Sequence, residues 1–273
     1  MRIEDQMELA GSYAEGKLLA GRIGNVGIVL FNQPEKRNAV SLEMWEGVCA
    51  ALDLFGAAED IRVVVYAGSG GKAFTSGGDI SQYAERRNSA EANSEYNRIA
   101  AKGREKMGAL AKPSIACIDG FCLGGGLSIA LLADLRVAAP DSMFGVPAAR
   151  LGLCYSAEAM ERLVTLIGPA RARLMIYTAR RINASEAFAM GLVDVIAGKD
   201  AASETLELAI TIADNAPLSV AAAKFFIDQV QKQPKERDEA RMLEHMSRCM
   251  DSSDYREGRS AFMEKRKPAF LGA

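Results

Sequence analysis

The sequence predicts an α/β fold, and three features of the chain support that prediction. Short strand-like runs alternate with helix-like runs up to about residue 200. Two glycine-rich turns each follow a strand-like run and precede a helix-like run. From residue 203 onward the chain has an almost entirely helical pattern. Such alternation is typical of parallel strands joined by crossover connections, with helices packed on the sheet.

The first elements expected are a pair of strands and a helix. Residues 18–31 contain two apolar runs around the turn dipeptide Gly24-Asn25, which predicts a hairpin. Ser41 is a good N-cap for the next helix, with Met44 completing the first turn. The apolar stripe predicted for this helix consists of Trp45, Val48, Leu52 and Leu54.

The remaining elements follow from apolar runs and helix-favouring segments. A glycine-rich loop is expected over 68–78, a polar helix within 82–110, and a loop beginning at 143–147. The last helix of the alternating part ends at Gly191, a typical C′ residue. Further strands are predicted over 61–67, 113–118, 136–139 and 192–196. Further helices are predicted over 127–134, 157–166, 170–178 and 184–190.

Composition excludes several classes of protein. With 273 residues, 49% of them hydrophobic, and a net charge of −2, the chain has ordinary globular composition and no overall field favouring nucleic acid or an anionic membrane. No basic-then-apolar leader opens the chain, and no apolar run reaches the roughly 20 residues that span a bilayer. Cys117, Cys122, Cys154 and Cys249 form no CxxC pair. We therefore expect a cytoplasmic protein with free thiols, no metal, and neither nucleic acid nor membrane as a partner.

The glycine triplet 124–126 is the most informative motif. It lies between a predicted strand and a predicted helix, so it removes every Cβ from a turn that ends in free helix N–H groups. Such a turn can approach a substrate closely and donate hydrogen bonds to an oxygen that carries negative charge. The motif therefore indicates carbonyl or phosphate chemistry.

A second glycine turn, Gly77-Gly78, follows the strand at 61–67 and its loop. Two N–H donors from separate loops are the minimum for an oxyanion hole. The GSGGK run at 68–72 lacks the GxxxxGK[ST] spacing of a phosphate loop, and GxGxxG is absent as well. Carbonyl chemistry is thus favoured over nucleotide binding, although either glycine loop alone could be purely structural.

Together, these segments resemble the crotonase family of enoyl-CoA hydratases and isomerases. The matching stretches run in the family's order over nearly the whole chain. They are Asn32-x-Pro-x-x-x-Asn-Ala39, Ala73-Phe-x-x-Gly-Gly-Asp-Ile80, Lys112-Pro-x-Ile-Ala, Gly124-Gly-Gly126, Asp134, Phe144-Gly-x-Pro147, Gly168-Pro-Ala-x-Ala172, Ala184-x-x-Ala187, Gly191-Leu-Val193 and Glu257-Gly-x-x-Ala-Phe-x-Glu-Lys-Arg-x-Pro268.

The resemblance implies a particular architecture and ligand. The fold would be a spiral core of repeated ββα units over 1–200, followed by a C-terminal helical oligomerisation region over 201–273. The assembly would be a homotrimer or a hexamer built as a dimer of trimers. The ligand would be an acyl-CoA, with coenzyme A as part of the substrate, so no separate cofactor is expected.

The resemblance also assigns roles to individual residues. The N–H groups of Gly78 and Gly125 would form the oxyanion hole for the thioester oxygen, stabilising an enolate-like intermediate. Lys36 and Arg37 would contact the nucleotide end of coenzyme A, and Lys265 would reach it from the C-terminal region. These three cations could equally be solvated surface charges. Further ligand-binding candidates within the matching motifs are Ala39, Ala73, Asp79 and Ile80.

The chain departs from the family at its acid and base positions. Ser128 and Ala148 stand where hydratases carry their two glutamates. Tyr155 and Ser156 stand where other members carry an aspartate. One positioned acid or base is worth about 10²–10⁴ in rate, so ordinary hydration is doubtful. The only histidine, His245, lies in the helical C-terminal region, where we expect a solvated or interface residue.

Replacement groups for the missing carboxylates are available. Ser128 and Tyr155 are the site candidates. Decarboxylases of the family place a tyrosine at the position of Tyr155, although Tyr155 could merely pack on the acyl pocket. Carboxylates that could enter the pocket, but that are more typical of exposed helix charges, are Glu85, Glu91, Glu95, Glu158 and Glu161.

Three functions therefore remain open at the level of sequence. The first is an acyl-CoA lyase or isomerase with a non-standard proton-transfer group. The second is a decarboxylase of a malonyl-type thioester that uses Tyr155. The third is a non-catalytic acyl-CoA binding protein. We favour the first, because a complete charge-stabilising site is hard to explain without chemistry.

Overall fold

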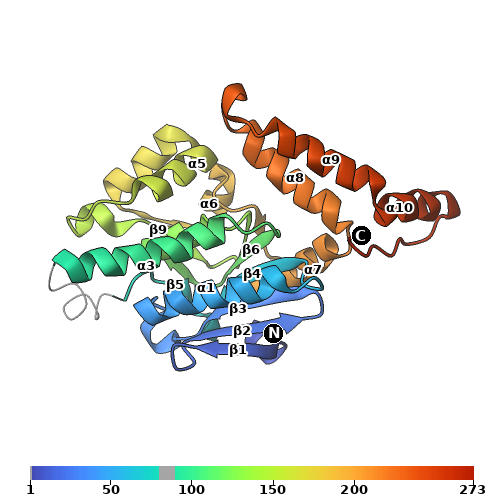
Figure 1. The fold of residues 1–273 in the computed structure, drawn as a ribbon. Helices are drawn as coiled ribbons and strands as arrows, with labels where there is room; N and C mark the ends of the chain where they lie inside the picture. The colour runs from blue at the N-terminus through green and yellow to red at the C-terminus, as the bar shows by residue number, and fades with distance from the viewer. Residues whose placement is uncertain (1, 80–89) are drawn as a thin grey trace.

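The structure is a computed structural model that describes residues 2–79 and 90–273, with the backbone alone for residues 90–93. Ile80 and Glu85, two of the candidates from the sequence, fall outside these ranges, as does the side chain of Glu91. Two sheets and a set of helices make up the fold (Figure 1).

The larger sheet has seven strands. Its order is β1 (Glu8–Tyr13), β2 (Leu18–Ile23), β3 (Val26–Phe31), β4 (Val63–Gly68), β6 (Ser114–Ile118), β8 (Leu135–Ala138) and β11 (Val195–Ile196). The first three strands form an antiparallel meander, and the pairs from β3 to β11 are all parallel. Strand β3 is buried along its whole length and β4 along nearly all of it, which explains their continuous apolar sequences.

A smaller four-stranded sheet lies beside the first. Its order is β10 (Arg181–Asn183), β9 (Met143–Gly145), β7 (Phe121–Leu123) and β5 (Ala73–Thr75). Along the chain, each of β4, β6 and β8 is followed by a short strand of this sheet and then by a helix. This repeat confirms the predicted α/β core of ββα units.

Helices cover both faces of the larger sheet and extend beyond it. They are α1 (Leu42–Ala57), α3 (Ala90–Gly108), α4 (Gly125–Ala130), α5 (Ala157–Thr178), α6 (Ala184–Met190), α7 (Ala201–Ala213), α8 (Pro217–Val230), α9 (Glu239–Asp251) and α10 (Ser253–Glu264). Helices α1 and α3 pack together over one face, whereas α7 packs against β3, β4, β6 and β8 on the other. Helices α8, α9 and α10 form an arm that projects from the core (Figure 1).

Most predicted elements are present, with local corrections. Ser41 caps α1 by accepting a hydrogen bond from the Met44 N–H, as expected. Leu54 does not belong to the buried stripe, because it lies only two positions after Leu52 and so points to another side of the helix; it is 40% exposed. Phe55 takes its place in the core.

The predicted loops at 68–78 and from 143 contain β5 and β9, and β7 and β10 were not predicted. These four strands have three residues each, too few to show an apolar period. The strand expected over 192–196 is limited to Val195–Ile196. The glycine break between the two predicted helices at 157–178 is a non-helical Gly168, with φ 75°, inside α5.

The helical region after residue 200 has two parts. Its first helix, α7, buries Ala201, Leu206 and Ala209 against the larger sheet. The guanidinium of Arg62, just before β4, donates to the carbonyls of Ala213 and Phe270, and so ties both ends of the arm to the core. Among the helices of the described chain, no single one has the length and apolar character to cross a membrane; α7 and α8, bent by 105°, satisfy those two criteria only as a pair.

Candidate functional site

The two glycine turns meet beyond the carboxyl ends of β5 and β7. These strands are parallel neighbours, so the segments that follow them leave the sheet side by side. A Cβ on Gly77 would lie 2.8 Å from the Cα of Gly125, and a Cβ on Gly125 would lie 3.4 Å from the N of Gly78. Only backbone separates the two turns, so side chains at these positions would force them apart.

The N–H groups of Gly78 and Gly125 are available as donors. Neither makes a hydrogen bond within residues 2–79 and 90–273. Gly125 is the first residue of α4, where backbone N–H groups have no partner inside the helix. A Cβ on Gly126 would lie 1.9 Å from the carbonyl oxygen of Thr75, so this glycine allows α4 to begin directly against β5.

A buried asparagine holds the turn that carries Gly77 and Gly78. Asn38, in the left-handed region at φ 55°, donates through Nδ2 to the carbonyls of Ser69 and Ala73, at 3.0 and 2.8 Å. Its own carbonyl accepts from the Thr75 hydroxyl at 2.6 Å, and that hydroxyl in turn accepts from the Gly77 N–H at 3.1 Å. Asn38 and Thr75 are thus structural residues of the site; Asn38 belongs to a matching motif, but neither residue was assigned a role from the sequence.

Ser128 and Tyr155 are brought together beside the glycine triplet. The Ser128 hydroxyl donates to the Tyr155 hydroxyl at 2.8 Å, and Tyr155 donates to the Gly124 carbonyl at 3.3 Å. Burial raises the pKa of Tyr155 well above its usual range, although the hydrogen bond from Ser128 opposes the shift. The pair is therefore neutral at physiological pH and can donate hydrogen bonds, but it cannot act as a strong base.

The carboxylates considered as replacements are engaged elsewhere where the structure describes them. Glu158 pairs with Arg104 at 3.6 Å, and Glu95 pairs with Arg98 on the surface of α3. Glu161 is exposed on α5, and Ala148 is buried where a catalytic glutamate would otherwise stand. Among these described candidates, the groups that lie beside the glycine triplet are thus the Ser128 and Tyr155 hydroxyls.

The remaining titratable candidates are also accounted for. His245 stacks on Phe225, with ring centroids 4.8 Å apart, in the arm formed by α8 and α9. All five cysteines are free thiols, Cys49 included. Within the described chain, no group of three or more His, Cys, Asp or Glu side chains is placed to hold a metal ion.

The candidate ligand-binding residues near the N-terminus cluster around the same turn. Lys36 forms an ion pair with Asp79 at 2.9 Å, and the Asp79 side chain is almost fully buried. Arg37 lies over the Phe121 ring, 5.5 Å from its centroid, and remains exposed. Ala39 and Ala73 are buried under the turn. Lys36 and Arg37 thus lie at the edge of the site, whereas the two alanines support it from beneath.

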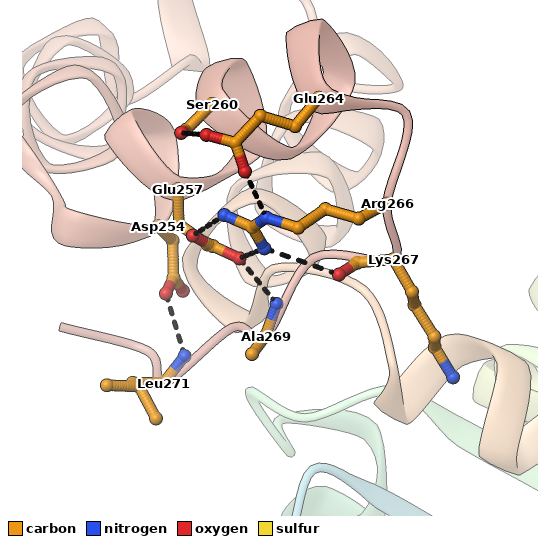
Figure 2. A network of polar contacts seen from close by, with 8 residues as sticks. All are labelled: Asp254, Glu257, Ser260, Glu264, Arg266, Lys267, Ala269 and Leu271. Atoms are coloured by element: carbon orange, nitrogen blue, oxygen red, sulfur yellow. Dashed lines mark hydrogen bonds and ion pairs between the residues drawn. The ribbon is translucent and has the colours of Figure 1, made fainter.

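Lys265 lies elsewhere in this chain. It ends α10 in the left-handed region, next to a network in which Arg266 is held between Glu257 and Glu264 (Figure 2). The Arg266 guanidinium and the Ala269 N–H lower the pKa of Glu257 to about 2. The tail beyond this network reaches Arg62 at the amino end of β4, opposite the glycine turns. A contact between Lys265 and the site would therefore need a second copy of the chain.

Comparison with known proteins agrees with this geometry. The family model for enoyl-CoA hydratase/isomerase matches residues 22–273. The chain belongs to the enoyl-CoA hydratase/isomerase family. This confirms the crotonase resemblance drawn from the motifs.

Characterised relatives of this family member cover nearly its whole length. It is 32% identical over 251 residues to the crotonyl-CoA hydratase of Syntrophomonas wolfei, covering 90% of this chain and 94% of the relative. It is 31% identical over 245 residues to the short-chain-enoyl-CoA hydratase of Clostridium acetobutylicum, covering 89% of this chain and 93% of the relative. An enoyl-CoA hydratase/carnithine racemase structure from Magnetospirillum magneticum superimposes with a TM-score of 0.89 at 34% identity, covering 96% and 97%.

Proposed function

We propose that this member of the enoyl-CoA hydratase/isomerase family is an acyl-CoA enzyme that stabilises an enolate between the N–H groups of Gly78 and Gly125. The contact between the two glycine turns is the observation that supports this most strongly. Within the part of the chain that the structure describes, it leaves two N–H donors without a hydrogen-bond partner on adjacent backbones, with no side chain between them. A thioester oxygen that accepted both would have its developing charge stabilised by fixed dipoles, one of them at a helix N-terminus.

Standard hydration is the part of the family's chemistry that this site supports least. Adding water to an enoyl thioester needs a base to deprotonate water and an acid to protonate carbon. Ser128 and Ala148 replace the two glutamates, and the neutral Ser128–Tyr155 pair supplies no base. The proposed chemistry is therefore a lyase or isomerase reaction through an enolate, in which a group other than the family's two glutamates transfers the proton, with Ser128 and Tyr155 near the reacting acyl group.

Crotonyl-CoA provides the direct measurement. We expect the chain to hydrate it about 10²–10⁴-fold more slowly than a relative that carries both glutamates, because one positioned acid or base contributes that much. The loss of the enoyl thioester absorbance measures the rate, with such a relative assayed in parallel. Turnover at the relative's rate would show that the missing glutamates do not matter.

A protein that binds acyl-CoA without turning it over is distinguished from an enzyme by two further measurements. Calorimetry with a panel of acyl-CoA thioesters measures affinity, and product analysis measures turnover on the same panel. Binding with no product on any thioester would indicate a non-catalytic acyl-CoA binding protein, as the empty carboxylate positions allow. Efficient turnover of any one member would exclude that function.

Decarboxylation of a malonyl-type thioester is the second candidate, favoured by the protonated Tyr155 hydroxyl beside the triplet. In this reaction the bond between the carboxylate and the α-carbon breaks, and carbon dioxide leaves. The electron pair forms an enolate, which the Gly78 and Gly125 donors would stabilise, and a proton then adds to the α-carbon. No carboxylate base is required, which suits a site that has lost its glutamates.

Carbon dioxide release from methylmalonyl-CoA tests this candidate. Wild type is expected to release it, and Tyr155→Phe to be slower by about 10²-fold or more, as for loss of a positioned proton donor. Tyr177→Phe is the matched control, since Tyr177 is 73% exposed on α5. Equal rates in wild type and Tyr155→Phe, or no release by either, would exclude a decarboxylase that uses Tyr155.

The proposed assembly is a homotrimer or a dimer of trimers, in the cytoplasm. Large apolar side chains on the arm support an interface there, because they are exposed in the single chain. They include Leu243, Met246, Met250, Phe262 and Met263. In such an assembly the arm of one chain could bring Lys265 to the ligand of another.

A further inference from the structure

The Gly124 carbonyl and the Gly125 N–H belong to the same peptide unit. A trans peptide is planar, and its carbonyl and N–H point in opposite directions. Whatever orients the Gly124 carbonyl therefore aims the Gly125 N–H at the same time. A hydrogen bond accepted by that carbonyl also polarises the peptide, because hydrogen-bonded groups in a chain strengthen one another.

This peptide unit is intrinsically free to turn over. It is flanked by glycine on both sides, and Gly124 has φ 55° and ψ −121°, a conformation open to glycine and strained for other residues. A turned peptide would direct its N–H away from the place where a thioester oxygen would lie. Some contact must therefore hold the observed orientation if the N–H is to serve as a fixed donor.

Two hydrogen bonds converge on the Gly124 carbonyl. One comes from the Ser128 N–H at 3.2 Å and closes the first turn of α4. The other comes from the Tyr155 hydroxyl at 3.3 Å, from a segment 31 residues further along the chain. The Ser128 hydroxyl donates to the Tyr155 hydroxyl at 2.8 Å, which adds one more hydrogen bond to this series. Among the described residues, Tyr155 is thus the side chain that holds this peptide unit from outside α4.

We propose that Tyr155 is a positioning residue that aims and polarises the Gly125 N–H through the Gly124 carbonyl, with Ser128 reinforcing it. This rests on the proposed role of Gly125 as an oxyanion donor. Loss of the carboxylates then has a structural counterpart, because the hydroxyl pair strengthens charge stabilisation instead of removing a proton from water. Because burial keeps the phenol protonated, the hydroxyl can donate to Gly124 across the physiological pH range.

Infrared difference spectroscopy of a bound thioester carbonyl measures donor strength directly. The probe is butyryl-CoA labelled with ¹³C at the thioester carbonyl, a saturated ligand that cannot be hydrated. In wild type we expect the carbonyl stretch at lower frequency than in buffer. In Tyr155→Phe the shift should shrink by about 10–30%, the cooperative share of one hydrogen bond. In Ser128→Ala the frequency shift should shrink less than in Tyr155→Phe. In the exposed control Tyr177→Phe the shift should equal that of wild type.

The affinity for butyryl-CoA, measured by calorimetry, should change by less than about threefold in Tyr155→Phe, because one bond is weakened and none to the ligand is removed. A general loosening of the pocket would instead lower affinity without a graded frequency change. If wild type shows no shift relative to buffer, the oxyanion site itself is refuted, and this inference with it. If wild type shows the shift and both Tyr155→Phe and Ser128→Ala retain it fully, the proposed function stands and the positioning role is refuted.

Discussion

Gly77→Ala is expected to lower turnover of the best acyl-CoA substrate by about 10²–10³-fold, the loss typical of removing one oxyanion donor. The added Cβ would lie 2.8 Å from the Cα and 2.9 Å from the N of Gly125, so the two glycine turns must separate. Neither atom can yield as a flexible side chain would, because both are backbone. Steady-state kinetics on the purified variant measures the loss, and circular dichroism checks that it is folded.

The matched control for this substitution is Gly16→Ala. Gly16 has φ 81° and Gly77 has φ 92°, so both substitutions impose the same kind of backbone strain. A Cβ on Gly16 would meet only the Ser12 hydroxyl, at 4.0 Å. Gly16→Ala should therefore keep the wild-type turnover. Equal activity of the two variants would mean that close contact between the turns is not needed for chemistry.

Arg136→Met is expected to destabilise the fold by about 1–3 kcal/mol, the cost of leaving buried hydrogen-bond acceptors without their donor. Arg136 is 3% exposed on β8 and binds the Asp194 carboxylate at 2.6 Å. It also donates to the carbonyls of Leu192 and Ala133, both at 2.9 Å. Methionine fills similar space but leaves these acceptors without their donor. Urea unfolding followed by circular dichroism measures the change.

Arg22→Met is the control for this prediction. Arg22 also pairs with a carboxylate at 2.6 Å, but both side chains are exposed to solvent. Exposed pairs contribute little, so the unfolding midpoint should stay close to that of wild type. A similar loss in both variants would mean that the methionine side chain, and not burial of the ion pair, causes the effect.

Much of the fold could be predicted because its determinants are local or periodic. Val63 to Gly68 is apolar almost throughout, and Ser41 is followed by an amphipathic helix, so the strand and the cap were identified correctly. The short strands of the smaller sheet could not be found, since three residues carry no period and their pairing depends on contacts distant in sequence. Leu54 was placed wrongly because its apolar character was followed, although its spacing of two residues from Leu52 puts it on another side of the helix.

The candidate site shows the same division. Glycine is informative in a sequence because few positions require it, so the turns at Gly78 and Gly125 were recognised and the structure brings them together. The sequence could not show that Ser128 and Tyr155 would hydrogen-bond, since 27 residues separate them. Nor could it show that Asn38 would anchor the loop before Gly77, although an asparagine shortly after Pro34 is a usable signal, because asparagine tolerates the positive φ found there.

Arg62 makes the arm a closed loop. Its guanidinium holds the carbonyl of Ala213, where the arm leaves the core, and that of Phe270, close to where the chain ends. A segment held at both ends has fewer conformations open to it in the folded chain than a free tail has, so α8, α9 and α10 are restrained as a unit. Since the closure lies at the amino end of β4, shifts of the arm are decoupled from the glycine turns at the opposite end. The packing of the arm can therefore change while the glycine turns keep their geometry.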